Sequence, residues 1–132
     1  GAVTEPWIGV NPNHVEINAA EEFDDPGSVY SFYKKLIAMR HNNATIATGE
    51  WNLVAADSEQ VYSFTRTSGD DTILVIVNLT DRTAQVPAEV AQLLEDGVGE
   101  SQVLLSTYDA VHSVKSVARG ELARWEGVVI QL

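Results

Sequence analysis

The chain has 132 residues, of which 19 are acidic and 8 are basic, so its formal net charge at pH 7 is −11. A chain of this length, 45% hydrophobic and free of cysteine, can bury a core without disulfides or thiolate zinc sites. The acidic balance and the scattered basic residues argue against nucleic acid and anionic membranes as partners. No apolar run reaches the roughly 20 residues of a membrane span, so we expect a soluble, cytoplasmic protein.

The first 25 residues are predicted to form a loop. They contain two prolines and three asparagines and show no sustained hydrophobic period. A structureless stretch of this length is uncommon inside a compact domain. The apolar residues Trp7 and Ile8 suggest that this loop lies over another surface.

An amphipathic helix is predicted over residues 26–41. Asp25 is expected to be its N-cap, and Pro26 suits the first helical position because its missing N–H costs nothing there. Tyr30 and Met39 widen the apolar arc, which indicates burial on more than one side. The apolar stripe itself consists of Val29, Phe32, Tyr33, Leu36 and Ile37.

After the helix the hydrophobic period changes from 3.6 residues to two, which is typical of strands. Residues 61–67 and 72–79 are predicted to form a hairpin around the turn at 68–71, and the continuous apolar run 72–79 should be a central strand covered on both faces. The predicted strands follow one another at intervals of about 8 to 12 residues with turns between them, which favours a mainly β fold, an antiparallel β-sandwich. The other predicted elements are strands at 46–48, 50–54, 82–86, 101–107, part of 111–117, 122–125 and 128–132, and a helical turn at 87–94.

Candidate chemistry is sparse. His14 and His112 have no acidic or seryl partner at a recognisable spacing, and His41 follows Arg40 at the predicted helix C-terminus, where it is expected to satisfy a free carbonyl. The acidic pairs lie before a helix or in turns, where they stabilise local structure. We therefore expect no catalytic residue, no metal site and no cofactor. The glycosylation sequon that begins at Asn78 ends a predicted core strand, so we expect no glycan there.

Two tryptophans are candidates for stacking on sugars. Trp51 and Trp125 each lie next to polar or charged residues, which favours partial exposure. Tyr62 and Phe64 are expected to pack in the core instead. A self-standing carbohydrate-binding sandwich is therefore one reading of the chain.

Residues 5–40 resemble the end of an α-glucosidase of glycoside hydrolase family 13, of the oligo-1,6-glucosidase kind. The resemblance rests on the order of four motifs: Pro-Trp-Ile-Gly-Val-Asn-Pro-Asn-His at 6–14, Glu-Ile-Asn at 16–18, Asp-Pro-Gly-Ser at 25–28 and Phe-Tyr-Lys-Lys-Leu-Ile-Ala-Met-Arg at 32–40. It continues more loosely through residues 62–66 and 75–80. Gly9 and His14 depart from the commonest pattern, which leaves the substrate preference open.

The resemblance implies a division into three parts. Residues 1–25 would be the connecting loop from the catalytic barrel, 26–44 the last barrel helix, and 45–132 the C-terminal antiparallel β-domain. The carboxylates of the family come from barrel strands that precede this segment, so the parent protein would be the enzyme and this chain alone would not.

Three functional readings follow. The chain is a non-catalytic part of a retaining α-glucosidase and packs against the missing N-terminal barrel through Val29, Phe32, Tyr33, Leu36 and Ile37. Alternatively, it is a carbohydrate-binding sandwich that uses Trp51 and Trp125. In the third reading it is an interaction module that self-associates through the exposed helix, because exposed apolar patches tend to associate. The third reading is compatible with the first.

Overall fold

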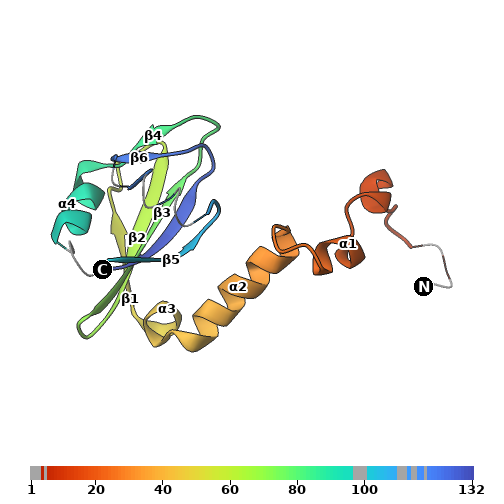
Figure 1. The fold of residues 1–132 in the computed structure, drawn as a ribbon, viewed down its shortest axis with the longest axis horizontal. Helices are drawn as coiled ribbons and strands as arrows, with labels where there is room; N and C mark the ends of the chain where they lie inside the picture. Colours follow the sequence, from red (N-terminus) through yellow and green to blue (C-terminus); the bar gives the residue numbers. More distant parts are fainter. Residues whose placement is uncertain (1–3, 5, 97–100, 110–112, 114–115, 118) are drawn as a thin grey trace. The chain divides into compact units, whose positions relative to one another are not determined.

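A computed structural model describes residues 4, 6–96, 101–109, 113, 116–117 and 119–132. The chain forms two compact units, Gly1–Ala38 and Met39–Leu132. Figure 1 labels the helices and strands of both. The boundary between these units falls inside the long helix, whereas the three-part division expected from the resemblance has its boundaries after residues 25 and 44.

The N-terminal segment contains two short helices, so the prediction of a plain loop is wrong here. A 3-10 helix spans Pro12–Val15, and helix α1 spans Ala19–Phe23. An asparagine begins each of them: Asn11 Oδ1 accepts from the backbone N–H of Asn13 at 3.2 Å, and Asn18 Oδ1 accepts from that of Ala20 at 3.0 Å. The asparagines that suggested a loop are therefore N-caps.

Helix α2 spans Val29–Asn42 and begins later than the predicted residue 26. The backbone N–H of Ser31 donates to Ser28 Oγ at 3.1 Å, so Ser28 caps the helix in place of the expected Asp25. Asp25 instead accepts from the N–H of Gly27 at 2.8 Å and closes the turn before the helix. The carboxylate of Glu22 accepts from the N–H of Tyr30 at 3.0 Å and satisfies a further free donor of the first turn.

Residues 46–48 are helical, which contradicts the strand predicted there. They belong to α3, which spans Ala44–Thr48 and is capped by Asn43, whose side chain accepts from the N–H of Ile46 at 3.0 Å. At its other end, Arg40 Nη2 and Arg66 Nη2 donate to the carbonyl of Ala47 at 3.4 and 3.3 Å. These tertiary contacts outweigh the strand propensity of the β-branched residues in the segment.

A five-stranded antiparallel sheet is the main element of the second unit. The hairpin β2–β3 matches the prediction, and Gly69 supplies the positive φ (61°) that its tight turn needs. The strands β5 and β7 also confirm predicted strands, and β3 is central in the order β1-β2-β3-β7-β5. The five strands are β1 Glu50–Val54, β2 Val61–Ser68, β3 Asp71–Asn78, β5 Gln102–Ser106 and β7 Gly127–Gln131.

A second, two-stranded sheet pairs β4, Ala84–Gln85, with β6, Glu121–Leu122. Helix α4, Ala88–Asp96, confirms the predicted helical turn and lies beside the main sheet (Figure 1). The strand predicted at 122–125 is wrong beyond Leu122, because a turn follows in which Trp125 has φ 56°. Ser113, Ser116 and Val117 are helical rather than extended, and residues 111, 112, 114 and 115 of that predicted strand lie outside the described residues.

The core lies on one face of the five-stranded sheet. Leu74 and Ile76 of β3 are fully buried there beside Val128 of β7. They pack against Ala84, Leu122 and Val90, which come from the small sheet and from α4. The chain is thus mainly antiparallel β, with two sheets closing one core, as predicted. Helices α2 and α4 correspond to predicted helical segments, whereas α1 and α3 were not predicted.

Asn78 joins three turns at the end of β3. Its side chain is completely buried, and Nδ2 donates to the carbonyls of Arg82 at 2.7 Å and Ala123 at 2.8 Å. Its Oδ1 accepts from the backbone N–H and the hydroxyl of Thr80. The amide that a glycan would modify is therefore buried and engaged, in agreement with the expectation of no glycan.

We predict that Asn78→Ala destabilises the chain by about 3 kcal/mol, because buried donors and acceptors on both sides of the turn lose their partners. Urea unfolding followed by tryptophan fluorescence measures the change. Asn52→Ala, at an exposed position of β1, is the matched control and should cost less than about 0.5 kcal/mol. Equal unfolding midpoints for the two variants would contradict the role of Asn78.

Candidate functional site

The two candidate stacking residues lie on different parts of the sheet. Trp51 is 47% exposed on β1, and its ring centroid is 6.3 Å from that of Phe64. Trp125 is 57% exposed in the turn before β7. Because β2 and β3 lie between β1 and β7, three strand spacings of about 4.8 Å separate the two positions. The structure therefore does not bring Trp51 and Trp125 together in one stacking platform.

Trp125 has a left-handed backbone, which costs a bulky residue of order 1–3 kcal/mol. Local hydrogen bonds hold it in place. Its N–H donates to the carbonyl of Thr80 at 3.0 Å, and its carbonyl accepts from Thr107 Oγ1 at 3.3 Å. The hydroxyl of Tyr108 donates to the carbonyl of Arg124 at 2.9 Å. These contacts fix the turn and leave the indole accessible.

The predicted contact face of the long helix is open in the first unit. Val29, Tyr33 and Ile37, at intervals of four residues, are 65%, 61% and 55% exposed. Phe32 and Leu36 are half-buried. The described residues of this unit thus leave three of the five apolar side chains of the stripe exposed, which is the arrangement expected of a surface that another part of a protein occupies.

The five-stranded sheet carries a second apolar face, opposite the core. Its central row crosses all five strands through the pairs Leu53–Phe64, Phe64–Val75, Val75–Val129 and Val129–Leu105. Successive residues of a strand point to opposite faces, so these side chains share one side of the sheet. We call it the aromatic face and define it as Trp51, Leu53, Tyr62, Phe64, Val75, Val77, Leu105 and Val129.

The aromatic face corrects two predictions. Tyr62 and Phe64 were expected in the core, but Tyr62 is 42% exposed and Phe64 is half-buried, because the core face of β2 carries Val61, Ser63 and Thr65. The central strand β3 was expected to be covered on both faces, yet Val75 and Val77 remain half-exposed. The sequence already indicates this for β2: successive residues of a strand point to opposite faces, so Val61 and Phe64, three residues apart, cannot both point into the core.

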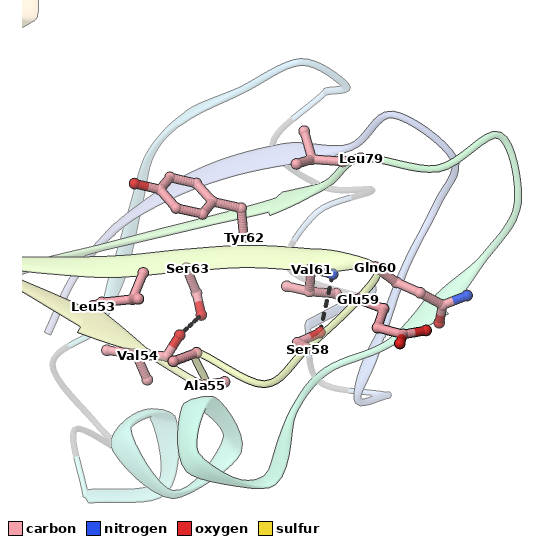
Figure 2. Close-up of a pocket in the computed structure, with 11 residues that line it drawn as sticks. Leu53, Val54, Ala55, Ser58, Glu59, Gln60, Val61, Tyr62, Ser63 and Leu79 are labelled. Carbon is pink, nitrogen blue, oxygen red and sulfur yellow. Dashed lines mark hydrogen bonds between the residues drawn. The ribbon is translucent and has the colours of Figure 1, made fainter.

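A pocket of about 290 Å³ lies beside the connection from β1 to β2 (Figure 2). Its polar wall is engaged locally: Ser63 Oγ donates to the carbonyl of Val54 at 2.8 Å, and Ser58 Oγ accepts from the N–H of Val61 at 3.1 Å. Glu59 is the one acidic residue among the described residues that line it. A retaining glycosidase needs two carboxyl groups about 5–5.5 Å apart. This pocket therefore does not have the groups of a glycosidase active site.

A buried carboxylate elsewhere has a structural role. Glu126 is fully buried, and its Oε1 accepts from Ser113 Oγ at 2.7 Å while its Oε2 accepts from the N–H of Ala123 at 2.6 Å. Ser113 is also fully buried and bonds to the hydroxyl of Ser106. A serine beside a carboxylate can suggest a nucleophile, but a substrate cannot reach a group with no exposed surface. The pair fixes the turn before β7.

In the part of the chain that the structure describes, no three histidine or acidic side chains come close enough to hold a metal ion. Among the same residues, no helix has the length and apolar character needed to cross a membrane.

Comparison with known proteins identifies the first third of the chain. The family model of the α-amylase catalytic domain matches residues 2–49. The match ends at Gly49, directly before β1 begins at Glu50. The segment that matches the catalytic-domain family is therefore followed directly by the first strand of the five-stranded sheet.

Longer relatives match nearly the whole chain. The oligo-1,6-glucosidase of Parageobacillus thermoglucosidasius is 33% identical over 96% of this chain and 22% of its own length. The crystal structure of Bacillus licheniformis trehalose-6-phosphate hydrolase is 28% identical, with a TM-score of 0.76 over 98% of this chain and 22% of its own. That of trehalulose synthase from Pseudomonas mesoacidophila MX-45 is 30% identical, with a TM-score of 0.72 over 96% and 22%.

The chain thus spans about a fifth of the length of the relatives it matches. The catalytic-domain match at its start and the oligo-1,6-glucosidase similarity along its length agree with the motifs at residues 5–40. We therefore identify the chain as an α-glucosidase-like segment of the α-amylase family, glycoside hydrolase family 13.

Proposed function

We propose that the chain is the non-catalytic C-terminal part of a retaining α-glucosidase that hydrolyses terminal α-glucosidic bonds of short oligosaccharides. The observation that carries this proposal is the position at which the catalytic-domain match ends: it ends at Gly49, and the strands of the five-stranded sheet follow. The similarity to oligo-1,6-glucosidases over nearly all of the chain supports the substrate class. The varied names of the solved relatives leave the linkage open.

In this proposal the three parts keep the limits expected from the motifs. Residues 1–25 connect the last barrel strand to the helix, residues 26–44 form the last barrel helix, and residues 45–132 form the β-domain. The open stripe of Val29, Tyr33 and Ile37 supports a helix that packs against a barrel, because burying each such side chain stabilises a protein by roughly 1.5–3 kcal/mol.

The chemistry then belongs to the barrel. Hydrolysis with retention of the anomeric configuration requires a nucleophilic carboxylate and an acid/base carboxyl group about 5–5.5 Å apart. The described residues supply no such pair at a pocket: Glu126 is buried in a turn, and Glu59 stands alone among the residues lining its pocket. The role left for this chain is to cover and stabilise the barrel.

We predict that the 132-residue chain alone does not hydrolyse an aryl α-glucoside, whereas the full-length polypeptide that contains it does. The release of the aryl alcohol measures both activities, with a mock preparation as the control. Turnover by the isolated chain above the mock level would contradict a non-catalytic role. A full-length protein without glycosidase activity would contradict the parent assignment.

The isolated chain is also predicted to self-associate through the helix stripe, because Val29, Tyr33 and Ile37 are more than half exposed in the structure. Ile37→Glu should weaken the association at least tenfold, since a charge replaces a side chain whose burial is worth about 1.5–3 kcal/mol. Sedimentation velocity at a chain concentration of tens of micromolar measures the association. Ala38→Glu, an exposed neighbour outside the stripe, is the matched control. A monomer at this concentration would count against the idea.

Carbohydrate binding by the β-domain is the second candidate function, and the exposure of Trp51 and Trp125 favours it. We expect single-ring, weak binding at most, because the two indoles do not share a platform. Titration of the chain with maltose and isomaltose, followed by tryptophan fluorescence, tests this. A saturable change that is lost in Trp51→Ala or Trp125→Ala would establish a binding module.

We extend the proposal to a cytoplasmic location. A chain without cysteine gains no disulfide stabilisation from an oxidising compartment, which supports the proposal. Fractionation of producing cells, with glucosidase activity as the readout, tests it.

A further inference from the structure

We propose that His14 is a substrate-binding residue of the full-length glucosidase. Its ring accepts a hydrogen bond from a hydroxyl group of the sugar unit on the leaving-group side of the scissile bond. The inference rests on the proposed function and deepens it, because it adds a part in substrate recognition to the covering role of this chain. All the contacts that carry it lie within the first unit, Gly1–Ala38.

The first argument concerns the place of residues 1–25 in a barrel. In a β/α barrel each helix runs back from the catalytic face, so the end of a strand, the connection after it and the start of the next helix lie together at that face. If α2 is the last barrel helix, as proposed, the residues before its start at Val29 lie at the catalytic face. Connections at this face build the active sites of such barrels.

The second argument is that His14 is held firmly in the 3-10 helix Pro12–Val15. Its backbone N–H and its ring Nδ1 both bond to the carbonyl oxygen of Asn11, at 3.0 and 2.9 Å. Its own carbonyl accepts from Asn18 Nδ2 at 3.1 Å. A side chain that is already fixed loses little conformational entropy when it binds a ligand.

The bond to Asn11 also determines what the ring can recognise. A carbonyl oxygen can only accept, so Nδ1 carries the hydrogen, and in the neutral imidazole Nε2 is then an acceptor. The two ring nitrogens point in different directions, and His14 is exposed, so a ligand can reach Nε2. A neutral acceptor of this kind suits the hydroxyl group of a sugar.

A series of contacts connects His14 to the start of α2. Asn18 Oδ1 caps α1 while its Nδ2 holds the carbonyl of His14. Glu22 of α1 in turn binds the next helix: its Oε2 accepts from the N–H of Tyr30 at 3.0 Å, and its carbonyl accepts from Ser28 Oγ at 2.7 Å. Glu22 is therefore a positioning residue, which acts on the substrate through the placement of His14.

The exposed position of His14 indicates which sugar unit it meets. An enzyme that cleaves a terminal bond takes in the terminal glucose first and buries it most deeply, whereas the second unit lies toward the entrance. Asn11 and Asn18 are engaged as helix caps, and Glu22 is engaged at α2. His14 keeps an acceptor at an exposed position, where the second unit lies.

Kinetics of the full-length polypeptide with two substrates test the inference. His14→Phe keeps a ring and removes the acceptor. The substrates are an aryl α-glucoside, which has no sugar beyond the scissile bond, and the better cleaved of maltose and isomaltose. We expect the ratio of kcat/KM for the disaccharide to that for the aryl glucoside to fall at least about threefold, which corresponds to one hydrogen bond. Most of the loss should lie in KM for the disaccharide. An unchanged ratio would overturn the inference.

A matched pair of variants tests the positioning role. Glu22 and Glu21 are neighbours in α1, but Glu21 is exposed and Glu22 is half-buried against α2. Glu22→Ala should lower the same ratio about twofold or more, because the turn that carries His14 loses its anchor. Glu21→Ala should leave the ratio unchanged. The double variant His14→Phe/Glu22→Ala should lose no more than His14→Phe alone, since Glu22 acts through that ring. Losses that multiply would contradict this role.

The outcomes separate the inference from the proposed function. A full-length protein that cleaves both substrates, and whose His14→Phe variant keeps the wild-type ratio, would overturn the inference and leave the function intact. An equal loss on both substrates would also overturn it, because the ring would then not recognise the second sugar unit. A full-length protein that cleaves neither substrate would overturn the proposed function, and the inference with it.

Discussion

The apolar side chains on both faces of β3 impose the constraint on which the rest of the β-domain depends. A strand of this kind is stable in water only when two layers cover it, and each exposed side chain left behind forfeits roughly 1.5–3 kcal/mol. The described residues supply one full layer, made by α4 and the β4–β6 pair. On the other side α3 covers one end, and Val75 and Val77 remain half-exposed. The described residues therefore cover one face of the sheet fully and the other only in part.

Buried polar groups act together with the core residues Val128 and Ile130 where β7 joins the sheet. The N–H of Asn78 donates to the carbonyl of Glu126 at 2.8 Å, and the side chains of both residues bind the same turn, at Ala123. Each group would be costly if unpaired in the interior. Because both are paired, the chain can reverse at Trp125 and place β7 beside β3 in a single register. Glu126 thus has a structural explanation that needs no catalysis.

The sequence predicts elements well where local and long-range demands agree. Residues 61–79 combine strict alternation, a glycine turn and a continuous apolar run, and the hairpin follows. Residues 46–48 were predicted to be a strand, but Asn43 caps a short helix there. Arg66, 19 residues further along the chain, donates to the carbonyl of Ala47, and periodicity cannot show such a contact. The motifs at 5–40 pointed to the family, and the comparisons agree. The alternation of residues 61–67 places Val61 and Phe64 on opposite faces of the sheet, but periodicity does not tell how exposed the second face is, because exposure depends on what covers the sheet.

Gly49 has a consequence for exchanging parts between related enzymes. A Cβ at this position would lie 2.5 Å from the carbonyl oxygen of Thr45 and 3.0 Å from that of Thr67, so no larger residue fits without moving backbone. The end of the segment that matches the catalytic domain is thus packed tightly against β2, and β1 begins directly after it. A chimaera spliced at residue 49 would separate α3 from the sheet that it packs on. The interchangeable module therefore includes α3, and a workable junction lies upstream of Asn43.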